Sequence, residues 1–290
     1  MHHRAGVTFR LNRPVPHHVG WAVVWPIISG YGKNCSGDAE KDVTMSESLI
    51  IFCREWAVTV ALTGYLAPAY QHPVMPVHGL AQLTRMLQAY PRMPVLLGLR
   101  PHEHVVDLYR LRPLLAGRAV LFVGRCFYWT DYNLPEWLAL ERYGFCTWDA
   151  MQDPFSRRME LRRFSRLCVD VKDEGDDRGG RPAIPHMTET QVLERANRWL
   201  YRELSATGLT GYEVRVLSLM TEGRNGNLPS RTRSLHKNNG LYKLGMTKRL
   251  TDLFRGVKVR AALQSGLSQQ TEDSSPETGD IIPLRQEARR

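Results

Sequence analysis

Short apolar runs alternate with helical stretches through the first half of the chain, and this alternation limits the fold more than any other feature. The runs at 49–53, 95–97 and 119–123 are apolar throughout, as expected for strands buried on both faces of a sheet. The stretches between them place apolar residues at helical spacing. Strands that alternate with helices in this way predict βαβ units, and therefore a parallel sheet covered by helices on both sides.

The expected elements cover the chain from residue 49 to residue 167. The expected strands are 49–53, 95–97, 119–123 and 145–147, with a poorly marked one between residues 70 and 77. The expected helices are 56–67, 78–90, 104–115, 135–143 and 154–167. A polar and helical region follows, so the predicted fold class is an α/β parallel-sheet domain followed by an all-α domain.

Length and charge limit the partners. The 290 residues, 43% of them hydrophobic, are enough for about two domains with real cores. The formal net charge of +10 indicates an anionic partner such as nucleic acid or a membrane surface. No window reaches the roughly 20 apolar residues that span a bilayer, since the best run, Trp21–Ile28, is broken by Pro26. We therefore expect no membrane partner.

The five cysteines are an odd number and form no C-x-x-C pair, which is neither a disulfide framework nor a zinc pattern. This usage suits a reducing, cytoplasmic location. Cys53 and Cys146 fall on expected strands, so they are interpreted as core residues rather than nucleophiles. The residues His102, Glu103, His104 and Asp107 lack the spacing of a helical metal site and are interpreted as solvated loop residues. No metal, cofactor or catalytic residue is predicted, and the chain is not expected to be an enzyme.

Composition changes mark the divisions of the chain. The stretch after Cys168 is rich in Asp, Glu and Gly and ends in prolines, which is typical of a linker. Thr188 and Gln191 then form a capping-box pattern at the start of a helix that Gly208 ends. The predicted divisions are a mobile extension at 1–44 with Met45 as a candidate translation start, the α/β domain at 45–168, the acidic linker at 169–187, a helical domain at 188–263 and a disordered tail at 264–290.

The positive charge is concentrated in residues 209–263. Eleven Lys and Arg stand there against three Asp and Glu, which gives +8 of the net +10. A small, strongly basic helical module after a linker is typical of nucleic-acid binding. A solvated basic face is the alternative on charge alone.

Two patterns in this module resemble the LuxR/FixJ-type helix-turn-helix. Residues 209–223 begin with a Leu-Thr pair, carry Glu213 in the first turn and end at a glycine, like the first helix of that family. Residues 232–246 resemble its recognition helix and the Lys-Leu-Gly turn that follows it. The resemblance implies a helix in the major groove of double-stranded DNA. The residues it would bring to DNA are Arg231, Thr232, Arg233, His236, Lys237, Asn239 and Lys243, with Lys243 on a phosphate.

The module departs from the family pattern in two ways. Thr232 follows Gly223 by only nine positions, fewer than in the family, so the supporting helix is shortened or replaced by residues 224–229. Arg233 and Gly240 occupy positions where the family has aliphatic core residues, and a glycine inside a helix costs about 1 kcal/mol relative to alanine. We therefore expect DNA binding that is weak or dependent on a partner.

The α/β domain before such a module resembles a response-regulator receiver. Receivers transfer a phosphoryl group to an aspartate after the third strand, using an acidic pair, a hydroxyl residue and a lysine. Here Gly98 stands at the phospho-acceptor position and Arg54-Glu55 at the acidic pair, while Gly124 and Trp148 replace the hydroxyl residue and the lysine. The resemblance implies a pseudo-receiver that is not phosphorylated by the standard route.

Residues 62–66, Leu-Thr-Gly-Tyr-Leu, also resemble the capsule-synthesis group of bacterial co-regulators. The leading hypothesis is a transcriptional regulator that binds DNA independently of phosphorylation, as a homodimer or as a heterodimer with another LuxR-type regulator. The alternative is a protein-interaction module that modulates a response regulator and does not itself bind DNA.

Overall fold

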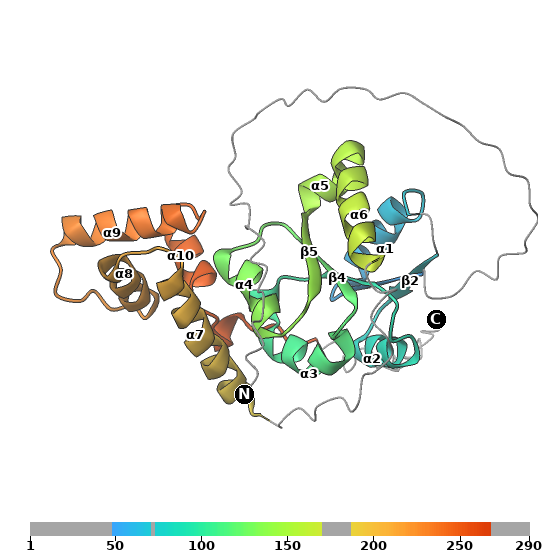
Figure 1. Ribbon diagram of the computed structural model, residues 1–290, viewed down its shortest axis with the longest axis horizontal. Coiled ribbons are helices and arrows are strands. Elements are labelled where there is room, and N and C mark those ends of the chain that lie inside the picture. The colour runs from blue at the N-terminus through green and yellow to red at the C-terminus, as the bar shows by residue number, and fades with distance from the viewer. Residues whose placement is uncertain (1–47, 71–72, 170–186, 268–290) are drawn as a thin grey trace, which may run out of the picture.

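A computed structural model describes residues 48–70, 73–169 and 187–267, which form a five-stranded sheet followed by a helical module (Figure 1). The predicted extension at 1–44, nearly all of the acidic linker and residues 268–290 of the predicted tail lie outside the described residues. Within the described part of the chain, no helix has the length and apolar character needed to cross a membrane.

The sheet is parallel throughout, with the strand order β2-β1-β3-β4-β5. Its strands are β1 (Leu49–Cys53), β2 (Val74–Val77), β3 (Val95–Gly98), β4 (Ala119–Gly124) and β5 (Arg142–Thr147). This confirms the predicted fold class. The order reverses between β1 and β3, and in doubly wound sheets ligands bind outside the carboxyl ends of the strands at such a point.

Helices cover both faces of the sheet (Figure 1). On one face lie α1 (Trp56–Leu66), α5 (Trp148–Gln152) and α6 (Pro154–Val169), and on the other lie α2 (Leu80–Ala89), α3 (Val105–Leu115) and α4 (Trp129–Trp137). The fully buried strands β1 and β4 explain the continuous apolar runs in the sequence, because both of their faces pack against helices.

The predicted helix at 135–143 is wrong, and the short helix α5 was not predicted. Helix α4 instead begins after Tyr128, whose backbone N–H donates to the Asp131 carboxylate at 2.8 Å. Pro135 lies late in this helix, although proline is most common in the first turn. Residues 142 and 143 belong to β5. The aromatic run before Pro135 therefore forms most of helix α4, and the residues from 142 onward form strand β5.

The helical module contains α7 (Glu189–Ala206), α8 (Gly211–Thr221), α9 (Ser230–Lys243) and α10 (Leu250–Gly256). Helix α7 begins with the predicted capping box of Thr188 and Gln191. Gly208 follows its end with a φ of +76°, a conformation that glycine adopts without strain.

The helical module packs directly on the sheet domain. Helix α7 lies against α3 and α4, and α10 lies against α4, so that one apolar core continues across the junction. The hydroxyl of Thr130 in α4 donates to the backbone carbonyl of Arg255 in α10 at 3.2 Å. The two domains are thus joined by a packed interface in addition to the covalent linker.

Residues 260–267, here called the C-terminal strap, return from the helical module to the sheet domain. The side-chain amide of Gln264 accepts a hydrogen bond from the Val105 N–H at the start of α3 at 3.0 Å and donates to the His102 carbonyl at 2.9 Å. The N–H of Leu267, a buried residue, donates to Asp107 Oδ2 at 3.0 Å. Residues 264–267, which the sequence assigns to the tail, therefore help to hold the two domains together.

Candidate nucleic-acid interface and the hollow at the strand ends

A hollow of about 880 Å³ lies at the carboxyl ends of the strands. It is lined by all five positions that the receiver resemblance singles out, namely Arg54, Glu55, Gly98, Gly124 and Trp148. These five positions therefore lie together at one end of the sheet. Position 98 of the lining is a glycine, and the carboxylates that line the hollow are Glu55, Glu103 and Asp149.

A thiol fills the space beside Gly98. Cys53 pairs with Gly98 in register across β1 and β3. A Cβ atom at position 98 would lie 2.0 Å from Cys53 Sγ, so no larger residue fits unless Cys53 moves. Burial raises the pKa of Cys53, and likewise that of Cys146, to about 12, which keeps both thiols protonated. The prediction that Cys53 and Cys146 are core residues is confirmed by their burial.

The interpretation of His102, His104 and Asp107 as solvated loop residues is wrong, because all three are buried. His102 Nδ1 lies 2.8 Å from Asp131 Oδ1, which joins the turn before α3 to α4. Burial lowers the pKa of His104, and this favours its neutral form. Among the described residues, no three His, Cys, Asp or Glu side chains are placed to hold a metal ion.

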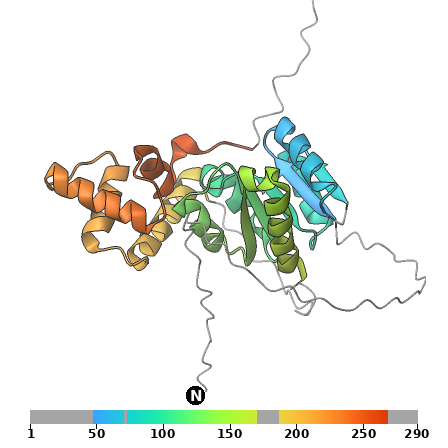
Figure 2. The ribbon, with the colours of Figure 1, turned by 90° about the horizontal axis from the view of Figure 1, so that it is seen from above.

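Helix α9 lies on the side of the helical module that is farthest from the sheet (Figures 1 and 2). Its outward face carries Arg231, Leu235, Asn239 and Tyr242, all of them exposed. Leu241 on the opposite face is fully buried and belongs to the apolar core of the module. The helix therefore presents one full face to solvent and is anchored to α8 by the other.

The predicted DNA-binding residues divide into two groups by their surroundings. Arg231 and Asn239 are exposed, and Lys237 is half-buried. Lys243 is also exposed, whereas Thr232, Arg233 and His236 are half-buried. The His236 ring stacks on Tyr212 of α8 at 5.5 Å between centroids, and Arg233 donates to the Asn225 carbonyl at 3.2 Å. Thr232 makes no such contact with the described residues, and its side chain is half-buried. Of the predicted line, Asn239 and Lys243 are therefore exposed, whereas Thr232 and His236 are half-buried.

Lys243 contacts a buried acid. Its Nζ donates to Glu213 Oε2 at 2.8 Å, and Glu213 is only 3% exposed. Burial acts to raise the pKa of Glu213, but hydrogen bonds from Lys243 and from the Thr210 backbone and hydroxyl outweigh it, and the pKa is lowered. Glu213 also caps α8 through the Thr210 N–H at 2.8 Å. This pair joins the start of α8 to the end of α9.

Gly240 allows the two helices to approach closely. A Cβ atom there would lie 2.9 Å from Leu217 Cδ1 of α8. The stretch 222–229 between the helices contains turns and no helix, so the supporting helix of the family pattern is replaced by a loop. The α8–α9 contact at Gly240 therefore leaves no room for a side chain at this position unless Leu217 moves.

No protein-family model matches this chain, and no curated protein matches it. Among solved structures, it is similar to full-length FixJ from B. japonicum, with a TM-score of 0.33 and 15% sequence identity over 73% of this chain and 96% of that chain. A TM-score this low does not establish a shared arrangement.

Proposed function

We propose that the protein is a transcriptional regulator that binds double-stranded DNA through α9. The observation that carries the proposal is the exposed basic start of this helix. Its first turn holds Arg231 and Arg233 and no acidic residue. Positive side chains at a helix N-terminus are unfavourable next to the helix dipole, and a bound phosphate offsets that cost.

The surroundings of α9 add to its positive potential. Exposed basic side chains lie on α8, in the loop before α9 and in the segment before α10, namely Arg215, Arg224, Lys248 and Arg249. Lysine and arginine that neutralise DNA phosphates release counterions, which gives affinity without sequence choice. Asn239 is the exposed side chain on α9 suited to a base edge, since an amide can pair with adenine.

Regulation in this proposal does not use phosphorylation. The Cys53 thiol occupies the space in which an acceptor side chain at position 98 would lie. No carboxylate pair follows β1, where Arg54 and Glu55 stand. Hard cations such as Mg²⁺ prefer several oxygen ligands, and the two positions directly after β1 offer one carboxylate, that of Glu55.

Salt-dependent DNA binding tests the proposal. The double variant Arg231→Ala/Lys237→Ala should bind a mixed-sequence duplex more weakly, and the slope of log K against log salt should shrink by about 2, because two phosphate contacts are lost. Fluorescence anisotropy across a salt series measures both. The matched control is Arg162→Ala/Arg166→Ala on exposed positions of α6. An unchanged slope in the α9 variant would contradict the proposal.

A second function is favoured by the apolar residues on the same face of α9. Leu235 is 56% exposed and Tyr242 is 75% exposed. An exposed Leu and Tyr on one helix face suit a protein partner, such as a second copy or another LuxR-type regulator. In that case Leu235→Ala/Tyr242→Ala should abolish co-purification with the partner, while Arg231→Ala/Lys237→Ala should leave it unchanged.

A further inference from the structure

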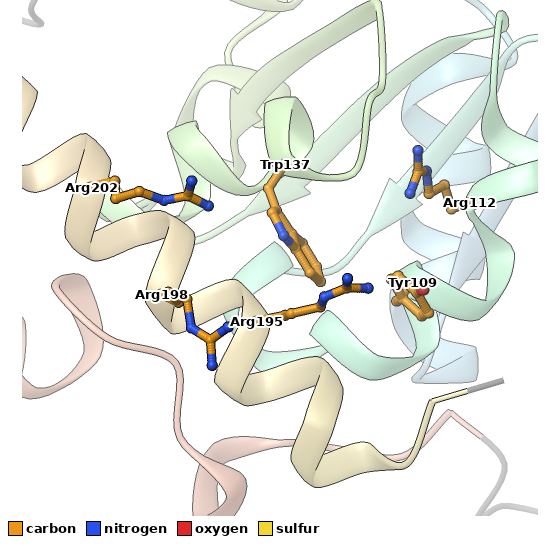
Figure 3. Close-up of a pocket in the computed structure, with 6 residues that line it drawn as sticks. All are labelled: Tyr109, Arg112, Trp137, Arg195, Arg198 and Arg202. Atoms are coloured by element: carbon orange, nitrogen blue, oxygen red, sulfur yellow. The ribbon is translucent and has the colours of Figure 1, made fainter. Parts of the chain in front are cut away.

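A second hollow, of about 490 Å³, lies at the junction of the sheet domain and the helical module (Figure 3). Helices α3, α4 and α7 each contribute side chains, so both domains form it. Its lining consists of Tyr109, Arg112, Trp137, Arg195, Arg198 and Arg202. All of its charged groups are arginines.

The three arginines of α7 are spaced so that one helix face carries them all. Arg112 adds a fourth guanidinium from α3. On α6, by contrast, Arg163 forms an ion pair with Glu160 at 2.6 Å. Within the described part of the chain, none of the four arginines of the hollow forms an ion pair, and Arg195 donates to the Met187 sulfur at 3.3 Å. Four like charges without acidic partners favour an anionic ligand.

Two aromatic rings form the other part of the lining. The rings of Tyr109 and Trp137 stack with 5.7 Å between centroids and an angle of 27°. Figure 3 shows the Trp137 indole extending toward α7, between the side chains of Arg202 and Arg195. Tyr109 is buried and Trp137 is half-buried, so the indole is the ring that a ligand can reach. A flat apolar surface beside guanidinium groups suits a ligand that has both a ring and a negative charge.

We propose that this hollow binds a phosphorylated nucleoside. Arginine binds phosphate oxygens in a bidentate manner, and an indole face stacks on a nucleobase. The volume lies within the range of small-molecule pockets, about 300–1,000 Å³. Inorganic phosphate alone would leave the indole unused, and Arg195, Arg198 and Arg202 are exposed, so that a phosphate chain can reach them.

Binding at this place has a consequence for the helical module. The ligand would contact α3 and α4 of the sheet domain and α7 of the module at the same time. It would therefore favour the packed arrangement of the two domains over any arrangement in which α7 moves away. This goes beyond DNA binding by α9, because the hollow and α9 share no residue.

Isothermal titration of the full-length protein tests the proposal, with ATP as the probe and tripolyphosphate as its base-free counterpart, both in EDTA. ATP should bind at least about tenfold more tightly than tripolyphosphate, since stacking on a base is worth about 1–3 kcal/mol. Arg195→Ala/Arg202→Ala should weaken ATP binding by at least about tenfold, because two charge-assisted contacts are lost. Arg162→Ala/Arg166→Ala, the matched control on α6, should leave it unchanged.

Trp137→Leu separates the two parts of the site. It should reduce the affinity for ATP to that for tripolyphosphate and leave tripolyphosphate binding unaltered. Thermal unfolding followed by circular dichroism checks that each variant folds. If Trp137→Leu does not fold, the Arg195→Ala/Arg202→Ala variant decides the outcome. The proposal would be overturned if ATP did not bind or if ATP and tripolyphosphate bound with equal affinity. It would also be overturned if Arg195→Ala/Arg202→Ala lost duplex binding without losing any ATP binding. That last result would show that Arg195 and Arg202 bind DNA instead of a nucleotide. If duplex binding is unchanged in Arg195→Ala/Arg202→Ala, the proposed role of α9 stands whatever the result with ATP.

Discussion

The strand-end hollow and the α9 surface differ in how their side chains relate to the fold. In the hollow, Cys53 and Gly98 pack together in register across β1 and β3, and position 98 carries no side chain. On α9, charged groups themselves hold helices, as the Lys243–Glu213 pair shows. The residues at a strand end can therefore change without loss of the sheet, since the sheet is stabilised by the burial of apolar side chains. At the α8–α9 pair, charge and fold depend on the same residues.

The largest effect is expected inside the sheet domain. Arg118 is 1% exposed, and its guanidinium donates to the carbonyls of Leu87, Tyr90 and Met93 at 2.8, 3.2 and 3.0 Å. Arg118→Met should lower the free energy of unfolding by about 3 kcal/mol or more, because three carbonyls lose a charged donor. Urea denaturation measures this. Arg85→Met on the exposed face of α2 should change it by less than about 0.5 kcal/mol; equal effects would show that the sheet domain does not depend on this buried charge.

The next effect tests whether charge holds the helical module. Lys243→Met should lower the free energy of unfolding by about 1–3 kcal/mol, because buried Glu213 loses a charged donor. Lys248→Met, at an exposed position, is the control.

The pKa of Glu213 is lowered from 4.5 in the folded protein, so its contribution to stability is complete above about pH 4.5 and is lost as the pH falls through the folded pKa. The pH profile of stability should lose this acid-side step in Glu213→Gln. A step of the same size in both proteins would show that the pair does not hold α8 to α9.

An effect of similar size is expected at the strand-end hollow. Gly98→Ala should lower the free energy of unfolding by about 1–3 kcal/mol, because the new methyl group overlaps Cys53 Sγ. Adding Cys53→Ala should recover part of this loss. Gly64→Ala is the matched control, since a Cβ there meets no atom within 4 Å and a helix gains about 1 kcal/mol from the change. Additive effects of Gly98→Ala and Cys53→Ala would show that the two sites do not share one space.

The sequence predicts the sheet better than the aromatic segment beside it. The strands β1, β3 and β4 are continuous apolar runs because both of their faces are buried. Such runs can be recognised from the sequence without knowledge of the contacts between elements. Helix α4 was misplaced because its start depends on the Asp131 carboxylate, which also accepts from the His102 backbone at 2.8 Å. That contact joins residues far apart in the chain, and a local pattern does not contain it.

The candidate site was predicted in part. The sequence identifies α9 and the strand-end positions, because both follow motif spacing. It does not show that Lys243 meets Glu213 or that Gly240 permits a close helix contact, since these depend on how α8 and α9 cross. The arginines of the junction hollow were missed because Arg112 and Arg195 come together only when α7 packs on α3.

The C-terminal strap has a mechanical consequence. The helical module meets the sheet domain through α7 near its beginning and through Gln264 and Leu267 near its end. A body fixed at two separate points cannot pivot freely about either one. The direction of α9 is thereby set by the sheet domain, so two copies that join through their sheets would also fix the spacing and angle of their two α9 helices. A DNA site with one half-site spacing would then fit, and others would not.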